Sequence, residues 1–216
     1  MSLVRGQYIE QIRRQIYGGF PPEDAEITVP LVNLWLDQAI AYAAQQNYRD
    51  NLKLDGVAYI NNGFYTKFKD LSVSKDEDSV WKIDLPQVPA GIGTSEGVST
   101  LTFKDADLNQ VSFPVVWLST NQLGFHRGMR VIPNKVLAYQ QGGSVYVMTP
   151  IVLSQYTAHV TMISGGNSSN LDSVLNVPAD YLPLVTRYLK EELMFERSVP
   201  VDEKSDGIDM VSSAPK

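Results

Sequence analysis

The chain has 216 residues, of which 44% are hydrophobic and 19% are charged, and this composition predicts a folded globular protein with one large domain or two small ones. It contains no cysteine, which excludes disulfide scaffolds, thiol catalysis and zinc sites with sulfur ligands. The net charge of −6 argues against general DNA binding, because attraction to phosphate grows with the number of basic contacts.

The N-terminal segment predicts a short helix over residues 3–17. Its apolar side chains Ile9, Ile12 and Ile16 recur at helical spacing, with polar residues between them. Gly18 ends the helix, and the prolines that follow prevent it from continuing. Because charged residues occupy the stretch where a signal peptide needs its apolar region, we expect a protein that is neither exported nor embedded in a membrane.

A second, longer helix is expected to run to about Asp50. Thr28 can cap it with its side chain, and Pro30 fits the first turn, where a missing N–H costs nothing. Its apolar positions form two stripes, with Leu31, Leu34, Trp35 and Tyr42 on one side and Val32, Leu36, Ala39, Ile40 and Ala43 on the other. A single core-facing stripe would need fewer apolar positions. We therefore expect this helix to be buried within its own fold or between subunits.

The middle of the chain, residues 56–170, changes to short alternating runs that predict an antiparallel β domain. In residues 156–162, for example, apolar and polar side chains alternate. Gly142 and Gly143 join two apolar runs into a predicted hairpin. Gly165 begins a small polar linker that closes the domain.

Helical spacing returns at residues 178–200, where we expect Asp180 to cap a helix and Pro183 to lie in its first turn. Its apolar stripe should pack against the N-terminal helices. The predicted fold class is therefore α+β: helices of residues 1–55 and 171–200 form one helical layer, and the β-rich domain is inserted between them. Residues 201–216 form an acidic tail that stays solvated unless a partner orders it.

We find no set of residues arranged for catalysis, metal binding or cofactor binding, and we expect a protein that is not an enzyme. The histidines, His126 and His159, are each expected to be exposed or hydrogen-bonded rather than ligands or bases. Asp105, Asp107 and Asn109 open like a calcium loop, but the later glycine and glutamate are missing. We interpret that segment as a hairpin turn.

Charge is unevenly distributed along the chain. No acidic residue occurs between Asp107 and Asp172, whereas Arg127 and Arg130 both lie there. This is either a chance deficit in a strand-rich region, where acids are disfavoured, or a surface that meets an acidic partner. The acidic tail of another copy, with Asp206 and Asp209, is one such partner.

Several segments resemble, in their order along the chain, the ring or head-to-tail connector proteins of crAss-like and related tailed bacteriophages. They are YGGFPPEDAEIT before the long helix, KDED in the β region, and VPADYLPLVTRYLKEEL with RSVPVDEKSDGID at the end. The resemblance covers roughly residues 1–55 and 175–210 together with the short acidic turn. Much of the β region, including GFHRGMR, has no counterpart in it.

The resemblance implies a structural virion protein assembled in the host cytoplasm. It would be one subunit of a homo-oligomeric ring of twelve copies, docked beneath the portal protein and contacting other ring or tail proteins. Such a ring joins head to tail and lines or seals the channel, with double-stranded DNA only as passing cargo and no membrane contact. The subunit or partner interface is expected to include Phe20, Trp35, Arg127, Arg130, Asp206 and Asp209.

A β-domain module that binds carbohydrate, or an adhesin-like protein, is the alternative function. In such a module exposed aromatic side chains stack on sugars. Trp81 and Trp117 lie in predicted strands and are the candidates, although we expect both to be core aromatics.

Overall fold

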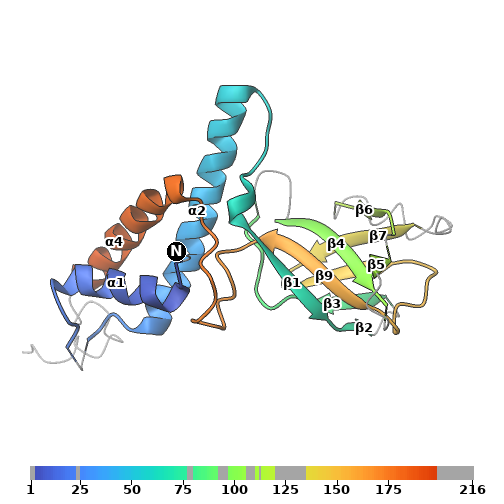
Figure 1. Ribbon diagram of the computed structural model, residues 1–216, viewed down its shortest axis with the longest axis horizontal. Helices are drawn as coiled ribbons and strands as arrows, with labels where there is room; N and C mark the ends of the chain where they lie inside the picture. The colour runs from blue at the N-terminus through green and yellow to red at the C-terminus, as the bar shows by residue number, and fades with distance from the viewer. Residues whose placement is uncertain are drawn as a thin grey trace, which may run out of the picture.

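The structure, a computed structural model, consists of a layer of helices beside a β sandwich (Figure 1). Helices from both ends of the chain form the layer, and the strands come from the region between them, as the sequence predicts. The residues that the structure describes are 3–22, 25–76, 80–91, 97–105, 110–111, 113–119 and 135–198.

Helix α1 (Arg5–Tyr17) forms where its isoleucines predict it. Ile9, Ile12 and Ile16 are buried, so the predicted stripe is the face that packs. The helix ends because Gly18 adopts a left-handed conformation with φ of 68° and donates its N–H to the carbonyl of Arg14.

Helix α2 (Val29–Asp55) begins at the predicted cap, with the N–H of Leu31 donating to Oγ1 of Thr28. It ends at Asp55 rather than near Asp50, because good helix formers continue to that point and Gly56 then supplies the left-handed cap. In Figure 1 the C-terminal end of α2 extends past α1 and α4.

Helix α4 (Leu182–Ser198) follows a single 3-10 turn, η3 (Ala179–Tyr181). The expectation that Asp180 caps this helix is wrong, because Asp180 lies inside that turn. Pro183 is in the first turn of α4, where its missing N–H breaks no helical bond.

The three helices share one hydrophobic core, as expected of terminal helices that pack together. Val185 and Leu189 of α4 and Val32 and Leu36 of α2 are completely buried in it. The core also includes Phe64 and other residues from the ends of the β insertion. Trp35 is half-buried at the margin of this core.

The β insertion forms two facing sheets. The first has the order β1-β9-β4-β5, and the second has the order β2-β3-β8-β7-β6. Alternate side chains from both sheets fill a second core, with Phe103 and Val160 from one and Ile83 and Val147 from the other. The strands are β1 (Tyr65–Leu71), β2 (Val73–Lys75), β3 (Trp81–Asp84), β4 (Val98–Lys104), β5 (Gln110–Val111), β6 (Val115–Trp117), β7 (Val136–Gln141), β8 (Ser144–Met148) and β9 (Thr157–Ile163).

The hairpin predicted around Gly142 and Gly143 is confirmed, since β7 and β8 pair antiparallel there and Gly142 has a φ of 60°. The prediction of an antiparallel domain is wrong at one edge, where β6 and β7 pair in parallel. Residues 118–135 connect these two strands, and a connection of that length can return the chain to the end from which it started.

The two ends of the insertion meet. The 3-10 turn η1 (Asn62–Phe64) leads into β1, Tyr65 pairs with Ile163 of β9, and the N–H of Ser164 donates to the carbonyl of Phe64. The chain therefore leaves the helical layer and returns to it at one place.

The returning segment does not form a free linker but lies against α1. The N–H of Arg5 donates to the carbonyl of Ser173 at 2.9 Å, and that of Gly6 donates to the carbonyl of Leu171 at 2.7 Å. Gly165 packs so closely that a Cβ there would clash with Cδ1 of Ile40. The joint between layer and sandwich is therefore tightly packed.

Candidate interaction surfaces

The best-placed titratable pair in the β sandwich is His159 and Asp70, whose Nε2 and Oδ1 atoms lie 3.2 Å apart. His159 is buried and hydrogen-bonded, whereas the Asp70 side chain is largely exposed. The sequence predicted that His159 would be either exposed or hydrogen-bonded, and the second alternative is the one observed. Asp70 has a φ of 57° and lies where the pairing register of β1 shifts between Phe68 and Leu71, an irregularity that bends a strand. The pair therefore holds this bend in place.

No group of three histidine or acidic side chains that could hold a metal occurs among the residues that the structure describes. His126, Asp107 and Asn109 lie outside those residues. Within the same described ranges, no helix is both long enough and apolar enough to cross a membrane.

The tryptophans proposed for sugar stacking pack against the β core. Trp81 is only 8% exposed, and Nζ of Lys75 lies 5.0 Å from the centre of its ring. Trp117 is half-buried against the same core. The prediction that Trp81 is a core aromatic is confirmed.

The two apolar stripes of α2 have different environments. The stripe that includes Val32 and Leu36 is completely buried. In the other stripe, Leu34 is 58% exposed and Tyr42 is 38% exposed. We call this second stripe, Leu31, Leu34, Trp35 and Tyr42, the outer stripe of α2. It is an apolar helix face that the single chain leaves partly uncovered.

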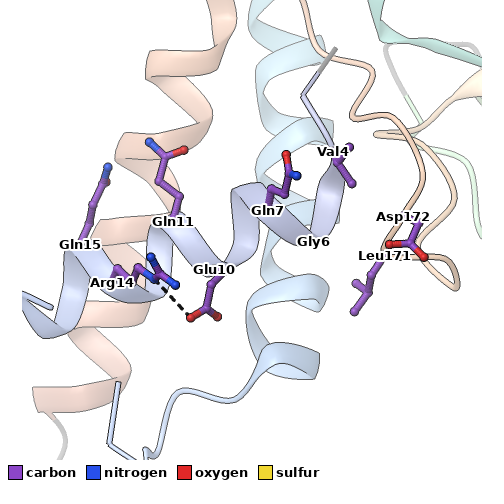
Figure 2. Close-up of a pocket in the computed structure, with 9 residues that line it drawn as sticks. All are labelled: Val4, Gly6, Gln7, Glu10, Gln11, Arg14, Gln15, Leu171 and Asp172. Carbon is purple, nitrogen blue, oxygen red and sulfur yellow. Dashed lines mark ion pairs between the residues drawn. The ribbon is translucent and has the colours of Figure 1, made fainter. Parts of the chain in front are cut away.

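A shallow groove of about 800 Å³ lies along the solvent side of α1 (Figure 2). Gln7, Gln11 and Gln15 project from successive turns of the helix, and Glu10 pairs with Arg14 at 3.5 Å. We call this surface the α1 groove. Its lining is Val4, Gly6, Gln7, Glu10, Gln11, Arg14, Gln15, Leu171 and Asp172.

A third surface is the free edge of β1. Strand β9 pairs with one side of β1, and no described strand pairs with the other side. Lys67 and Lys69 are exposed on this strand, and Phe68 between them points into the core. A groove of about 350 Å³ runs beside the strand and is bounded on its far side by residues of the returning segment such as Val174.

Of the residues predicted for an interface, two can be located. Phe20 is 81% exposed, with the guanidinium of Arg14 4.4 Å from the centre of its ring. Trp35 lies in the outer stripe of α2. Arg127, Arg130, Asp206 and Asp209 are outside the described residues.

Sequence reasoning missed the α1 groove and the β1 edge. The glutamines of the groove repeat every four residues, which places them along one side of a helix, and this spacing was a usable signal. The sequence signal for the β1 edge is weaker, because two lysines flanking a phenylalanine occur in many edge strands and do not identify this one. That β1 is an edge strand depends on sheet order, which the local pattern does not contain.

In the part of the chain that the structure describes, the fold is therefore that of an α+β protein in which a two-sheet sandwich interrupts a three-helix layer. No protein-family model matches the chain, and no curated protein matches its sequence. What the three surfaces do is accordingly inferred from their geometry and chemistry.

Proposed function

We propose that this chain is a structural subunit that assembles head to tail into a ring. The observation that carries the proposal is the outer stripe of α2. Leu34 and Tyr42 expose apolar surface on the same helix whose other stripe is fully buried. Burying such a stripe against another copy removes apolar area from water, at roughly 25 cal/mol per Å².

The helical layer also offers a second, chemically different surface. The α1 groove is lined by amide side chains and an ion pair, whereas the outer stripe of α2 is aliphatic and aromatic. A contact between two unlike surfaces is heterologous, and it repeats from copy to copy until a ring closes or a filament grows. Two such surfaces on different helices favour this kind of assembly over a two-fold dimer.

The resemblance of the terminal segments supports a more specific form of the proposal. In that form the ring is a virion connector of twelve copies beneath the portal, which joins head to tail and lines the DNA channel. The net charge of −6 suits such a conduit, because a lumen that repels phosphate lets the duplex slide, whereas a basic lumen would hold it.

Mass photometry and negative-stain imaging of the purified protein test the ring. We expect closed rings for the natural chain and monomers for Leu34→Glu, because a charge in the outer stripe cannot be buried without a partner. Val152→Glu is the matched control, since Val152 is 63% exposed and lies in the β sandwich. It should assemble normally.

If Leu34→Glu assembles as well as Val152→Glu, or if the natural chain remains a monomer at every concentration, the ring proposal is wrong. Emission of Trp35 gives an independent readout, because assembly should shift it to shorter wavelength. The connector role is tested separately by cosedimentation with portal-bearing capsids. Rings that form but never sediment with such particles would contradict that role alone.

A further inference from the structure

The free edge of β1 has the features of a site that accepts an extra strand. The backbone groups along one side of an edge strand have no partner in the sheet and can pair with another extended chain. The bend at Asp70 ends the straight part of β1, and Asn176 already bonds the side chain of Thr66 at 2.8 Å. The accessible stretch is therefore short, about residues 66–69.

Within residues 66–69 the charged side chains of this edge are both lysines. Neither Lys67 nor Lys69 makes an ion pair or a side-chain hydrogen bond to any residue that the structure describes. The adjacent acid, Asp70, lies just beyond this stretch, where its carboxylate is hydrogen-bonded to His159. Lysines on an edge repel cationic strands and lose hydration beside neutral ones, which protects against unwanted pairing. An acidic strand would instead be attracted.

Residues 199–216 contain a segment that matches this edge. Four acids, Asp202, Glu203, Asp206 and Asp209, outnumber two lysines there. Residues 208–211 are Ile-Asp-Met-Val, in which one acidic side chain lies between apolar ones. In a strand this order places Ile208 and Met210 on one face and Asp209 and Val211 on the other.

The alternation of β1 is complementary. Phe68 faces the core, and Lys67 and Lys69 face the opposite side. Because directly opposed residues share a face, a strand of residues 208–211 can place Ile208 and Met210 beside Phe68 and Asp209 beside the lysines. Val174, which is 48% exposed across the groove, adds a further apolar contact.

We propose that residues 208–211 of one copy add as a strand to the free edge of β1 in the next copy. The placement in a neighbouring copy rests on the proposed head-to-tail assembly. The chemistry of recognition is backbone pairing together with attraction between Asp209 and the two lysines, to which Asp206 adds negative charge just before the strand.

Chain length favours a neighbouring copy over the same chain. The turn before α4 lies beside the turn before β1, since the rings of Tyr181 in η3 and Phe64 in η1 are 5.6 Å apart. Helix α4 then runs away from the sandwich for 17 residues, which is about 25 Å (Figure 1). Ten residues from Ser198 to Ile208 span at most about 35 Å. Within one chain they would have to retrace α4 and then advance about 13 Å to the far end of this stretch of β1, about 38 Å in all, which exceeds that span.

The test is fluorescence anisotropy with a labelled peptide of residues 199–216 and the full-length protein. We expect saturable binding that Lys67→Glu with Lys69→Glu weakens by about tenfold, because the attraction of the two lysines for the acidic peptide becomes repulsion. A peptide carrying Asp206→Lys and Asp209→Lys should bind poorly to the natural protein and regain binding to the lysine-reversed protein. Arg49→Glu with Lys53→Glu, two exposed cations near the end of α2, is the matched control and should bind normally.

Failure of the natural peptide to bind, or binding unaffected by the lysine reversal, would overturn the proposal. Amide exchange on the full-length protein decides which copy supplies the strand. Protection of residues 66–69 that disappears on dilution supports a neighbouring copy, and protection that persists in the monomer overturns that part. Peptide binding to Leu34→Glu monomers tests the edge without the ring, so the two proposals fail separately.

Discussion

Arg5 is a charged side chain that the structure buries completely. Its guanidinium donates to Oδ1 of Asn33 at 2.6 Å, to Oδ1 of Asp37 at 2.7 Å and to the carbonyl of Gly165 at 3.3 Å. It thereby ties α1 to α2 and to the segment that returns from the sandwich. Burial raises the pKa of Asp37 even though the charge of Arg5 acts in the opposite direction.

Replacing Arg5 should therefore destabilise the fold strongly. Arg5→Met leaves Asp37 partly buried without its cation and leaves the carbonyl of Gly165 without a donor. Removing one member of a fully buried ion pair costs about 3–5 kcal/mol, and because the Asp37 side chain is 34% exposed we expect a smaller loss, about 2–3 kcal/mol. Urea unfolding followed by circular dichroism measures this, with Arg187→Met, an exposed helical pair with Glu191, as a control that should change stability by less than about 0.5 kcal/mol. Equal unfolding midpoints for the two variants would contradict the role of Arg5.

At the scale of elements, α2 depends on α4. Val185, Leu189 and Leu193 of α4 are completely buried in the helical core. The same core contains the buried stripe of α2 that includes Val32 and Leu36, which we call the inner stripe. Tyr42 of α2 stacks on Tyr188 of α4 with ring centres 5.2 Å apart. Since isolated helices are marginal in water, most of the stability of α2 comes from this packing.

Deleting residues 176–216 should consequently unfold α1 and α2 as well. Amide exchange over residues 31–43 should become fast, because the inner stripe loses its cover. Deleting only residues 199–216 is the control, and it should leave protection in the same segment unchanged. Equal protection of residues 31–43 in both truncations would show that α2 is stable without α4.

At the scale of the whole molecule, the sandwich is an insertion with adjoining ends. Tyr65 and Ile163 are paired, and Phe64 and Ile163 both belong to the helical core rather than to the β core. Each half of the molecule has its own hydrophobic cluster. The helical layer therefore contains the packing that it needs without the sandwich.

Replacing residues 66–162 with an Asn-Gly turn should leave a folded helical layer. Tyr65 and Ile163 already face each other as a hairpin requires, and Asn-Gly favours the tight turn that joins such strands. We expect helical circular dichroism and a cooperative thermal transition, at lower stability because Gln87 no longer bonds Ser168. A chain with helical signal but no cooperative transition would show that the layer needs the sandwich.

The sequence by itself determined the local elements of this protein. The isoleucines of α1, the cap at Thr28 and the turn at Gly142 act through neighbours in the chain, so periodicity and turn chemistry were sufficient to find them. The two stripes of α2 were also visible in the sequence. The sequence did not indicate which of the two stripes would be covered, because that depends on where α4 packs.

Only the tertiary structure decided the partners that lie far apart along the chain. The burial of Arg5 depends on contacts with Asn33, Asp37 and Gly165, and no local pattern distinguishes a helix arginine that is buried from one that is solvated. The parallel pairing of β6 with β7 and the free edge of β1 follow from strand order. Strand order is set by the joint optimum of core packing and loop closure, and a single segment does not encode it.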